Sequence, residues 1–272
     1  MRSSTQAVVE GGYTMQIQGH RGGFKPDNIL PTFQKSLDNN LEAIELDVWL
    51  TKDGLIVVCH GGDDGNLKDY GLPEEFIYEW TYERLKTLDA GEGAYLPLLE
   101  EVFQLFEGKI FINIEVKGPR TESLKPKYDC DKVVAEVLGL VDKYEMHQKF
   151  LISSFNYDVL ASAEKAREAR KETNPHFDII YLYNYENQPL PSPDEYLARG
   201  NGINISANHI NDEVVSQVKS KGLKLGVWIR AKDYTESEET YLQMLNYGID
   251  FICADFPLKA MATRERYFLK VE

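Results

Sequence analysis

The feature that most constrains the fold of this chain is the regular alternation of short β-rich runs with amphipathic stretches from residue 15 onwards. Such alternation is typical of parallel βαβ units in an α/β protein. Helices are expected over residues 30–39, 98–106, 130–144, 157–170, 213–221 and 237–247. Nine runs are predicted to be strands: residues 15–20, 43–50, 55–60, 109–117, 149–155, 177–184, 203–207, 223–230 and 250–256. Nine strands are one more than a closed (β/α)8 barrel needs.

The turn at residues 51–54, Thr-Lys-Asp-Gly, explains the surplus strand. It is far too short for a crossover helix, so the runs on either side must pair antiparallel as a β-hairpin. If Thr51 pairs with Gly54, Asp47 faces Val58 and Glu45 faces His60. The remaining eight strands predict a (β/α)8 TIM barrel, and the hairpin returns His60 to the strand end that carries the carboxylates.

The expected organisation is an N-terminal extension over residues 1–14 followed by a single barrel domain over residues 15–272. A chain of 272 residues with 43% hydrophobic content can bury one full-sized core. Residues 61–95 are rich in glycine, aspartate and aromatic residues, with a short helix expected around residues 82–88. This segment is interpreted as a small insertion at the barrel mouth.

Charge and cysteine content limit the classes of partner and compartment. The chain has 30 Lys+Arg against 44 Asp+Glu, a formal net charge of -14, which disfavours non-specific binding to nucleic acid or to an anionic membrane. The three cysteines predict neither a disulfide framework nor a zinc site. No apolar run is long enough for an integral membrane segment, so a cytoplasmic protein of undetermined oligomeric state is expected.

Polar residues that can do chemistry gather where barrel strands end, which is where a (β/α)8 barrel builds its active site. Because side chains alternate along a strand, Glu45 and Asp47 share one face. For the same reason Glu115 and Lys117 share one face of their strand. Clustered carboxylates without cysteine suit a hard divalent cation, Mg²⁺ or Ca²⁺. His20-Arg21 and His60 are expected at the same rim.

Each of these features also has a plainer interpretation. An E-x-D pair on a strand is more often a surface stripe or a salt-bridged pair, but this one lies between Ala43 and Val48, inside an apolar strand. Buried carboxylates need a cation or another partner. Cys59 faces away from its neighbour His60, and no G-x-S-x-G elbow is present, so neither a cysteine nor a serine nucleophile is indicated.

Several segments resemble one known family. GHRGGFKPDNILPTF and ELDVWLTKDGLIVVCH resemble the two opening blocks of the glycerophosphodiester phosphodiesterase family, and WTYERLKTLDAGEGAYLPLLEEVF resembles the stretch that follows. The likeness continues through INIEVK, LISSF, GVWIR and FICADFP, over most of residues 17–257. Asp27, Gly61-Gly62 and Ile229-Arg230 depart from the family pattern, which leaves headgroup specificity open.

The resemblance implies a small-molecule glycerophosphodiester substrate and a set of roles. It implies that Glu45, Asp47 and Glu115 hold the cation, His20 and His60 act as general acid and base, and Arg21 and Lys117 bind phosphate. The family reaction is usually drawn with attack by the substrate's own glycerol hydroxyl, giving a cyclic phosphate that water opens. Trp228, near a strand end, is expected from its position to contact the glycerol or the headgroup.

Two other functions stay open at this point. A lysophospholipase D or sphingomyelinase D-like enzyme has a similar barrel, and an apolar groove in the insertion, which holds Phe76, Tyr78, Trp80 and Tyr82, would favour it. A catalytically idle barrel that only binds a phosphodiester or a protein would require loss of part of the site. Both histidines and all three carboxylates are present.

Overall fold

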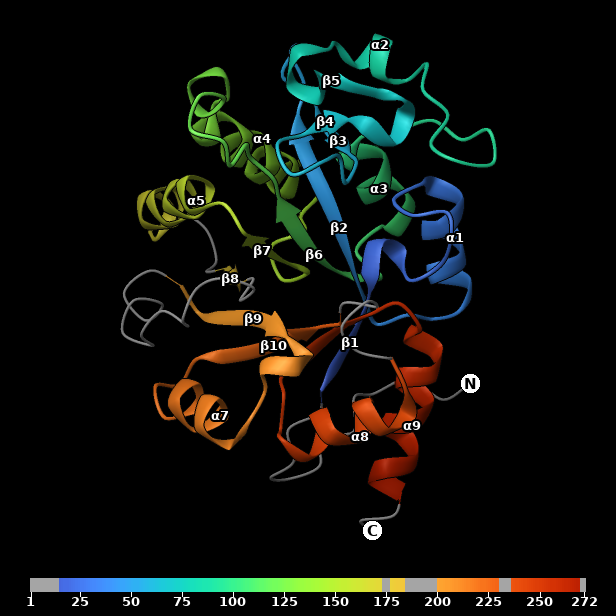
Figure 1. Cartoon of the computed structure of the whole chain (residues 1–272), viewed down its shortest axis with the longest axis vertical. Helices are drawn as coiled ribbons and strands as arrows, with labels where there is room; N and C mark the ends of the chain where they lie inside the picture. The colour runs from blue at the N-terminus through green and yellow to red at the C-terminus, as the bar shows by residue number, and fades with distance from the viewer. Residues whose placement is uncertain (1–14, 173–176, 184–199, 230–235, 270–272) are drawn as a thin grey trace.

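The expected barrel is the core of the structure (Figure 1), a computed structural model that describes residues 15–172, 177–183, 200–229 and 236–269. Among these residues, eight parallel strands pair in a closed ring, β1-β11-β10-β9-β8-β7-β6-β2, and β2 pairs with β1 to complete it. The strands are β1 (Gln16–Gly19), β2 (Ala43–Leu50), β6 (Phe111–Val116), β7 (Phe150–Ser154), β8 (Asp178–Tyr183), β9 (Gly202–Ser206), β10 (Lys224–Trp228) and β11 (Phe251–Ala254). Each lies within a run predicted from the sequence or within a residue of it.

Helices pack around the barrel with their polar faces outward, and several begin at residues that cap them. Asn156 caps α5, accepting hydrogen bonds from the backbone N–H groups of Asp158 and Val159. Ser237 and Asn211 do the same for α8 and α7. The helices are α1 (Leu30–Asp38), α2 (Tyr82–Leu85), α3 (Leu99–Phe106), α4 (Cys130–Lys143), α5 (Tyr157–Arg170), α7 (Asp212–Lys219), α8 (Glu238–Asn246) and α9 (Pro257–Leu269). Helix α9, which packs on α8 and β1, was missed by the sequence prediction.

The predicted hairpin is present, but its register differs by one residue from the predicted one. Strand β3 (Ile56–Val58) runs antiparallel to β2 with Val48 opposite Val58 and Leu50 opposite Ile56. The expected pairing of Thr51 with Gly54 was wrong, because the backbone N–H of Thr51 donates to the carbonyl of Leu55. The Thr51 hydroxyl closes the turn by accepting from the Leu55 N–H. Lys52, Asp53 and Gly54 therefore form a three-residue loop.

The insertion forms a small substructure beside the carboxyl end of β2 (Figure 1). It contains a two-stranded sheet that the sequence did not predict, β4 (Asn66–Leu67) with β5 (Leu72–Phe76), followed by the expected short helix α2. Tyr78, Trp80 and Tyr82 are 4–7% exposed, so these aromatic side chains are the core of the insertion and not the wall of an apolar groove.

Trp49 ties this insertion to the barrel. Its indole is 1% exposed and meets the ring of Tyr128 edge-on, with ring centroids 5.7 Å apart. A side chain at Gly65, which has φ +81°, would come within 2.8 Å of the indole, so the insertion loop needs glycine there. The indole Nε1 donates to the backbone carbonyl of His60 over 3.0 Å. Packing of the insertion therefore also fixes the position of His60.

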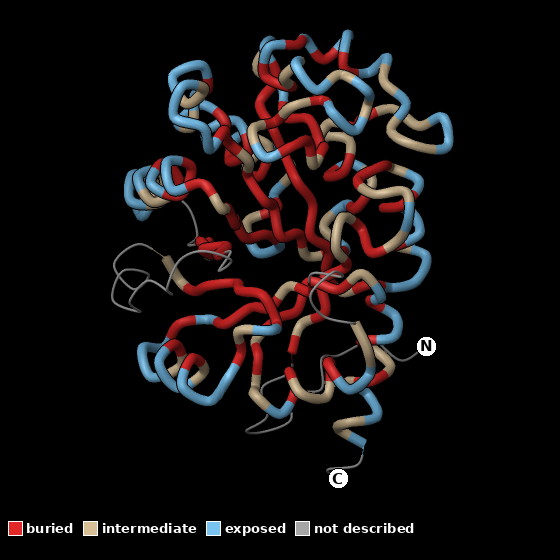
Figure 2. Tube along the Cα trace, in the orientation of Figure 1, coloured by how far each residue is buried: buried red, intermediate tan, exposed pale blue. Residues whose placement is uncertain are grey.

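The barrel interior is layered. Apolar side chains close one end, with Leu151, Ile180 and Phe251 packed together against Phe111. Above them a polar chain crosses the barrel, in which Ser153 donates to Asn113 and Asn113 donates to Gln18. Figure 2 shows the buried strands inside helices with exposed outer faces. The polar layer forms the floor beneath the strand ends that carry the titratable residues.

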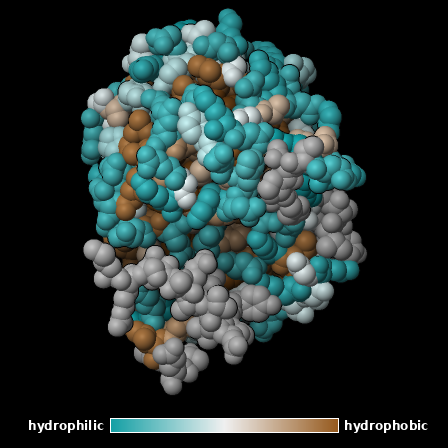
Figure 3. Space-filling model, turned by 180° about the vertical axis from the view of Figure 1, so that it is seen from behind, coloured by the Kyte–Doolittle hydropathy of each residue, from teal (hydrophilic) through white to brown (hydrophobic). Residues whose placement is uncertain are grey.

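The surface agrees with the acidic, hydrophilic composition. The face seen in Figure 3 is mostly hydrophilic, with only small separate apolar patches. Among the described residues, no helix has both the length and the apolar character needed to cross a membrane. The predicted extension at residues 1–14 and Arg230, which departs from the family pattern, lie outside the described residues.

Replacing Trp49 with alanine is expected to lower the free energy of unfolding by about 3–5 kcal/mol, because a large buried aromatic side chain is lost from the contact between insertion and barrel. Urea denaturation followed by circular dichroism measures this loss. Trp49→Phe, which keeps an aromatic ring in the same space, is the matched control and should lose clearly less. A loss below about 1 kcal/mol for Trp49→Ala would contradict this account of the insertion.

Candidate active site

Three carboxylates meet on the adjacent strands β2 and β6. The register pairs Asp47 of β2 with Glu115 of β6, and Glu45 lies two residues earlier on the same face of β2. All three residues are buried, with exposed fractions of 4% for Glu45, 1% for Asp47 and 7% for Glu115. One oxygen from each lies within 4.8 Å of the others. Three like charges at this separation need positive charge nearby.

Two basic side chains provide part of that charge. The Lys117 ammonium bridges Asp47, at 2.8 Å, and Glu115. The Arg21 Nε lies 3.3 Å from Asp47, and its backbone N–H donates to Glu45 over 3.0 Å. Arg21 has φ 50°, a left-handed backbone conformation, within the short 3-10 helix η1 (His20–Gly22) that also contains His20. Asn28, not identified from the sequence, donates to Asp47 over 2.9 Å.

Lys117 and Arg21 do not stabilise the charged form of the three carboxylates equally. Burial favours the neutral acid, but the charges of Lys117 and Arg21 outweigh it at Asp47 and hold the pKa of that carboxyl well below its usual range. Burial and the neighbouring Asp47 raise the pKa of Glu45 to about 8. Burial also raises the pKa of Glu115, despite Lys117. The cluster therefore lacks one positive charge, and that shortage is greatest at Glu45.

The residues present fit a divalent cation. Glu45 Oε1 is buried and has no hydrogen-bond partner among the described residues. This oxygen is therefore available as a metal ligand. An alternative set of His20, Glu45 and Cys253 is equally close. Burial raises the pKa of the Cys253 thiol well above its usual value, so this sulfur stays protonated and is a poor ligand. The all-oxygen set suits Mg²⁺ or Ca²⁺.

His20 directly follows β1 and faces the carboxylates from one side. Its Nε2 lies 4.0 Å from Glu45, and its Nδ1 lies 2.6 Å from a carboxylate oxygen of Asp255. Burial lowers the pKa of His20, but the hydrogen bond to Asp255 and the charge of Glu45 outweigh burial, so the pKa is raised. This histidine holds a proton more strongly than a free imidazole does.

His60 lies two residues beyond the end of β3 and interacts electrostatically with Asp47. Burial lowers the pKa of His60, and the charge of Asp47 raises it. The charges of Lys117 and Arg21 lower it further, so the pKa falls to about 3. The pKa values of the two histidines are therefore shifted in opposite directions, since the surroundings of His20 favour the charged form and those of His60 the neutral form. Such a pair can supply one acid and one base at the same time.

Asp255 is a site residue that the sequence reasoning missed. It follows β11, the last strand, which pairs with β1, the first, so barrel closure brings it to His20 across 235 positions of sequence. Glu236 accepts hydrogen bonds from the backbone N–H groups of Asp255 and Phe256, each over 3.0 Å. The sequence signal that could have identified Asp255 is its position just beyond an inward-facing residue of the last strand. Asp255 orients His20 and fixes which nitrogen carries the proton.

The histidines and carboxylates open into a cavity of about 370 Å³. Its far wall is largely apolar and includes Trp228, whose ring meets that of Phe155 edge-on at 6.3 Å. The Arg120 guanidinium lies 5.1 Å from the Phe155 ring at the rim of this cavity. The cavity is lined by His20, Arg21, Glu45, His60, Asp63, Asn113, Glu115, Lys117, Arg120, Ser153, Phe155, Leu182, Asn204, Trp228, Ile229, Cys253 and Asp255.

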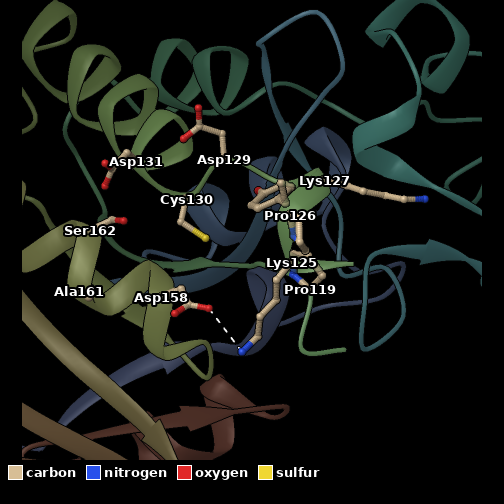
Figure 4. A pocket seen from close by; sticks show the side chains of 11 residues that line it. Pro119, Lys125, Pro126, Lys127, Asp129, Cys130, Asp131, Asp158, Ala161 and Ser162 are labelled. Atoms are coloured by element: carbon tan, nitrogen blue, oxygen red, sulfur yellow. Dashed lines mark ion pairs between the residues drawn. The ribbon is translucent and has the colours of Figure 1, made fainter. Parts of the chain in front are cut away.

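A second cavity, of about 570 Å³, lies at the start of α4 and α5 and is drawn in Figure 4. Its charged side chains are already paired within the protein. Lys125 lies 3.5 Å from Asp158, Asp129 caps α4, and Asp131 pairs with Lys165 at 2.6 Å. Burial raises the pKa of Cys130 to about 11, so its thiol is unreactive at neutral pH. This larger cavity therefore offers no matching chemistry.

Comparison with known proteins identifies the family to which this chain belongs. Residues 20–259 match the model of the glycerophosphoryl diester phosphodiesterase family. A glycerophosphodiester phosphodiesterase of Bacillus altitudinis is 30% identical over 266 residues, which cover 92% of this chain and 98% of the relative. A candidate glycerophosphodiester phosphodiesterase of known structure from Galdieria sulphuraria is 29% identical, with a TM-score of 0.78 over 94% of this chain and 99% of that one.

A further solved structure supports the fold alone. It is a phosphodiesterase from Oleispira antarctica in complex with the product sn-glycerol-3-phosphate, 24% identical, with a TM-score of 0.74 over 93% of this chain and 98% of that one. The family match spans almost all described parts of the barrel and begins at His20. Together with the barrel and its residues, these matches show that the chain belongs to the glycerophosphoryl diester phosphodiesterase family.

Proposed function

We propose that this protein hydrolyses small glycerophosphodiesters to glycerol phosphate and an alcohol, with a divalent cation bound by Glu45, Asp47 and Glu115. The observation that carries this proposal is the buried carboxylate cluster, in which Glu45 Oε1 has no described hydrogen-bond partner. Two histidines with opposite protonation preferences flank that cluster. Membership of a phosphodiesterase family supplies the reaction class.

A divalent cation held by Glu45, Asp47 and Glu115, Mg²⁺ or Ca²⁺, would supply positive charge that offsets the negative charge of the phosphate and of the attacking oxygen. The protein's own basic residues add to this. Lys117 and the Arg21 guanidinium lie beside Asp47, and both can meet the phosphate while remaining close to the carboxylates. The site thereby gathers positive charge for an anionic substrate on a protein whose net charge is -14.

His60 is assigned as the first base and His20 as the first acid. Neutral His60 takes the proton from the glycerol hydroxyl next to the phosphate, and that oxygen forms a bond to phosphorus. The phosphorus bond to the alcohol breaks, and the proton on His20 passes to the alcohol oxygen. Water then opens the cyclic phosphate with the two roles exchanged, which returns both histidines to their starting state. Asp255 stabilises the charged form of His20.

Water-soluble diesters are favoured over lysolipids as substrates. The aromatic side chains that could have formed an acyl groove, including Tyr78 and Trp80, are buried within the insertion. The cavity of about 370 Å³ has room for a glycerol group and a small headgroup, with Trp228 and Phe155 against their carbon atoms.

The three free cysteines, Cys59, Cys130 and Cys253, support a reducing compartment, and we place the reaction in the cytoplasm.

Turnover of glycerophosphocholine, glycerophosphoethanolamine and glycerophosphoinositol should require added Mg²⁺ or Ca²⁺ and stop in EDTA, because Glu45 and its neighbours cannot bind the phosphate without a cation. Enzymatic assay of released glycerol phosphate measures this, with lysophosphatidylcholine in parallel. Full activity in EDTA would contradict the metal assignment. Turnover of the lysolipid alone would move the function to a lysophospholipase D.

Replacing either His20 or His60 with alanine should lower kcat by about 10²–10⁴-fold, because each removes a proton-transfer group from the reaction. Steady-state kinetics on glycerophosphocholine at saturating metal measure the loss. His147→Ala is the matched control, since His147 pairs with Asp142 outside the cavity and should retain wild-type kcat. A loss below about threefold for both catalytic variants would overturn the acid and base assignment.

Binding of Mg²⁺ or Ca²⁺ near neutral pH should release a proton. In the metal-free protein the pKa of Glu45 is about 8, so this carboxyl is largely protonated at pH 7 and must lose the proton to become a ligand. Cation affinity should therefore rise from pH 6 to pH 8 and level off above. Calorimetry in two buffers of different ionisation enthalpy counts the proton, and Glu45→Gln should abolish its release. Buffer-independent heats and a flat affinity would contradict the account.

A further inference from the structure

Asn204 of β9 is a buried polar residue that the proposed mechanism does not use. It is 2% exposed and lines the cavity that holds the histidines and carboxylates. Its side-chain oxygen Oδ1 is fully buried and accepts no hydrogen bond from any described residue. An unpaired buried oxygen costs about 1–3 kcal/mol, so its presence at a cavity wall calls for a functional reason.

The neighbouring strands explain why Asn204 Oδ1 has no hydrogen-bond partner among the described residues. The register places Leu182 of β8 beside it on one side and Gly226 of β10 on the other. Gly226 has no side chain, and the ring of Phe251 fills the space that one would take. Neither neighbour has a side chain that can donate a hydrogen bond. The other polar residues of the barrel floor differ, because Gln18, Asn113 and Ser153 bond to one another.

The position of Asn204 within the barrel separates it from the carboxylate cluster. Glu45 Oε1, Arg21 Nε and Asn28 Oδ1 also lack a hydrogen-bond partner among the described residues, but they belong to that cluster and its supports. In the strand ring, β9 is four places from β2 in either direction, so Asn204 lies on the wall opposite Glu45. A ligand that extends from the carboxylates across the cavity reaches Asn204.

We propose that Asn204 Oδ1 accepts a hydrogen bond from the terminal hydroxyl of the substrate's glycerol group, and so selects diesters in which that hydroxyl is free. This inference rests on the proposed function. A glycerophosphodiester carries two free hydroxyls, and the one next to the phosphate is the proposed nucleophile, which gives its proton to His60. The terminal hydroxyl points away from the carboxylates, towards the cavity wall that contains Asn204. Around Asn204, Leu182, Phe155 and Trp228 offer apolar surface for the carbon chain.

This arrangement also determines the substrate class. In a 1-acyl lysophospholipid, the oxygen at the terminal position is an ester oxygen and has no proton to donate. Binding it would bury two acceptors against each other and leave Asn204 unpaired. Sites built to bond a substrate hydroxyl reject analogues that lack it far more strongly than apolar pockets reject a missing methylene. Asn204 thus favours fully deacylated diesters over lysolipids.

The test compares glycerophosphocholine with the phosphocholine diester of propane-1,2-diol. The second substrate keeps the hydroxyl next to the phosphate but lacks the terminal one, and choline has no hydrogen-bond donor that could replace it. The wild-type kcat/KM should be at least tenfold higher for glycerophosphocholine. In Asn204→Leu, which has similar size and no acceptor, this ratio should fall below threefold. Asn204→Ala should act in the same direction.

Thermal denaturation separates this role from a structural one. Because the Asn204 oxygen has no described partner, Asn204→Leu should not lower the melting temperature in the absence of ligand. A wild-type enzyme that does not discriminate between the two diesters would overturn the inference without any variant. So would an unchanged ratio in Asn204→Leu, or equal losses on both substrates accompanied by a lower melting temperature.

Failure of the proposed function has a different signature, namely no turnover of either diester by the wild-type protein with Mg²⁺ or Ca²⁺. The inference about Asn204 is then decided by calorimetric binding of sn-glycerol 3-phosphate and of propane-1,2-diol phosphate. Binding of the glycerol compound at least tenfold tighter, with the difference lost in Asn204→Leu, supports the hydroxyl contact. Equal affinities would overturn it.

Discussion

The burial of three carboxylates within one small volume is the constraint on which the rest of the structure depends. Glu45, Asp47 and Glu115 lie on two adjacent strands, β2 and β6, where the fold brings them close together and excludes most water. Lys117 and Arg21 neutralise Asp47 effectively, as its low pKa indicates, but they leave Glu45 with a strongly raised pKa. The fold thus maintains a deficit of positive charge at one defined point, which a divalent cation and the surrounding basic groups can remove.

The scaffold orients the groups around that point through contacts distant in sequence. Barrel closure brings Asp255 to His20, while the hairpin and the indole of Trp49 bring His60 into the same cavity. These different surroundings separate the pKa values of two chemically identical side chains, because an acidic partner raises one and burial beside cations lowers the other. Position alone thus produces the difference in protonation on which the proposed acid and base roles rest.

Much of the fold and the titratable part of the site could be predicted from the sequence. Runs rich in β-branched residues, such as the Phe-Ile-Asn-Ile-Glu-Val of β6, locate the strands, and alternation places Glu115 inward. The hairpin register was wrong by one residue, because the Thr51 side chain closes a longer loop than the turn sequence implied. The role of Asp255 depends on which strands become neighbours in the barrel. The role proposed for Asn204 depends on the absence of a hydrogen-bond donor on the strands beside it. Single-sequence patterns do not carry that information.

The most direct test of the central claim is anomalous diffraction from crystals of the wild-type protein soaked in Mn²⁺, a redox-stable stand-in for Mg²⁺ with the same preference for oxygen ligands. The account predicts one strong anomalous peak bonded to carboxylate oxygens of Glu45, Asp47 and Glu115 at about 2.0–2.6 Å, the range of hard cations with oxygen ligands. A peak held elsewhere in the molecule, or an unoccupied cluster at saturating Mn²⁺, would contradict it.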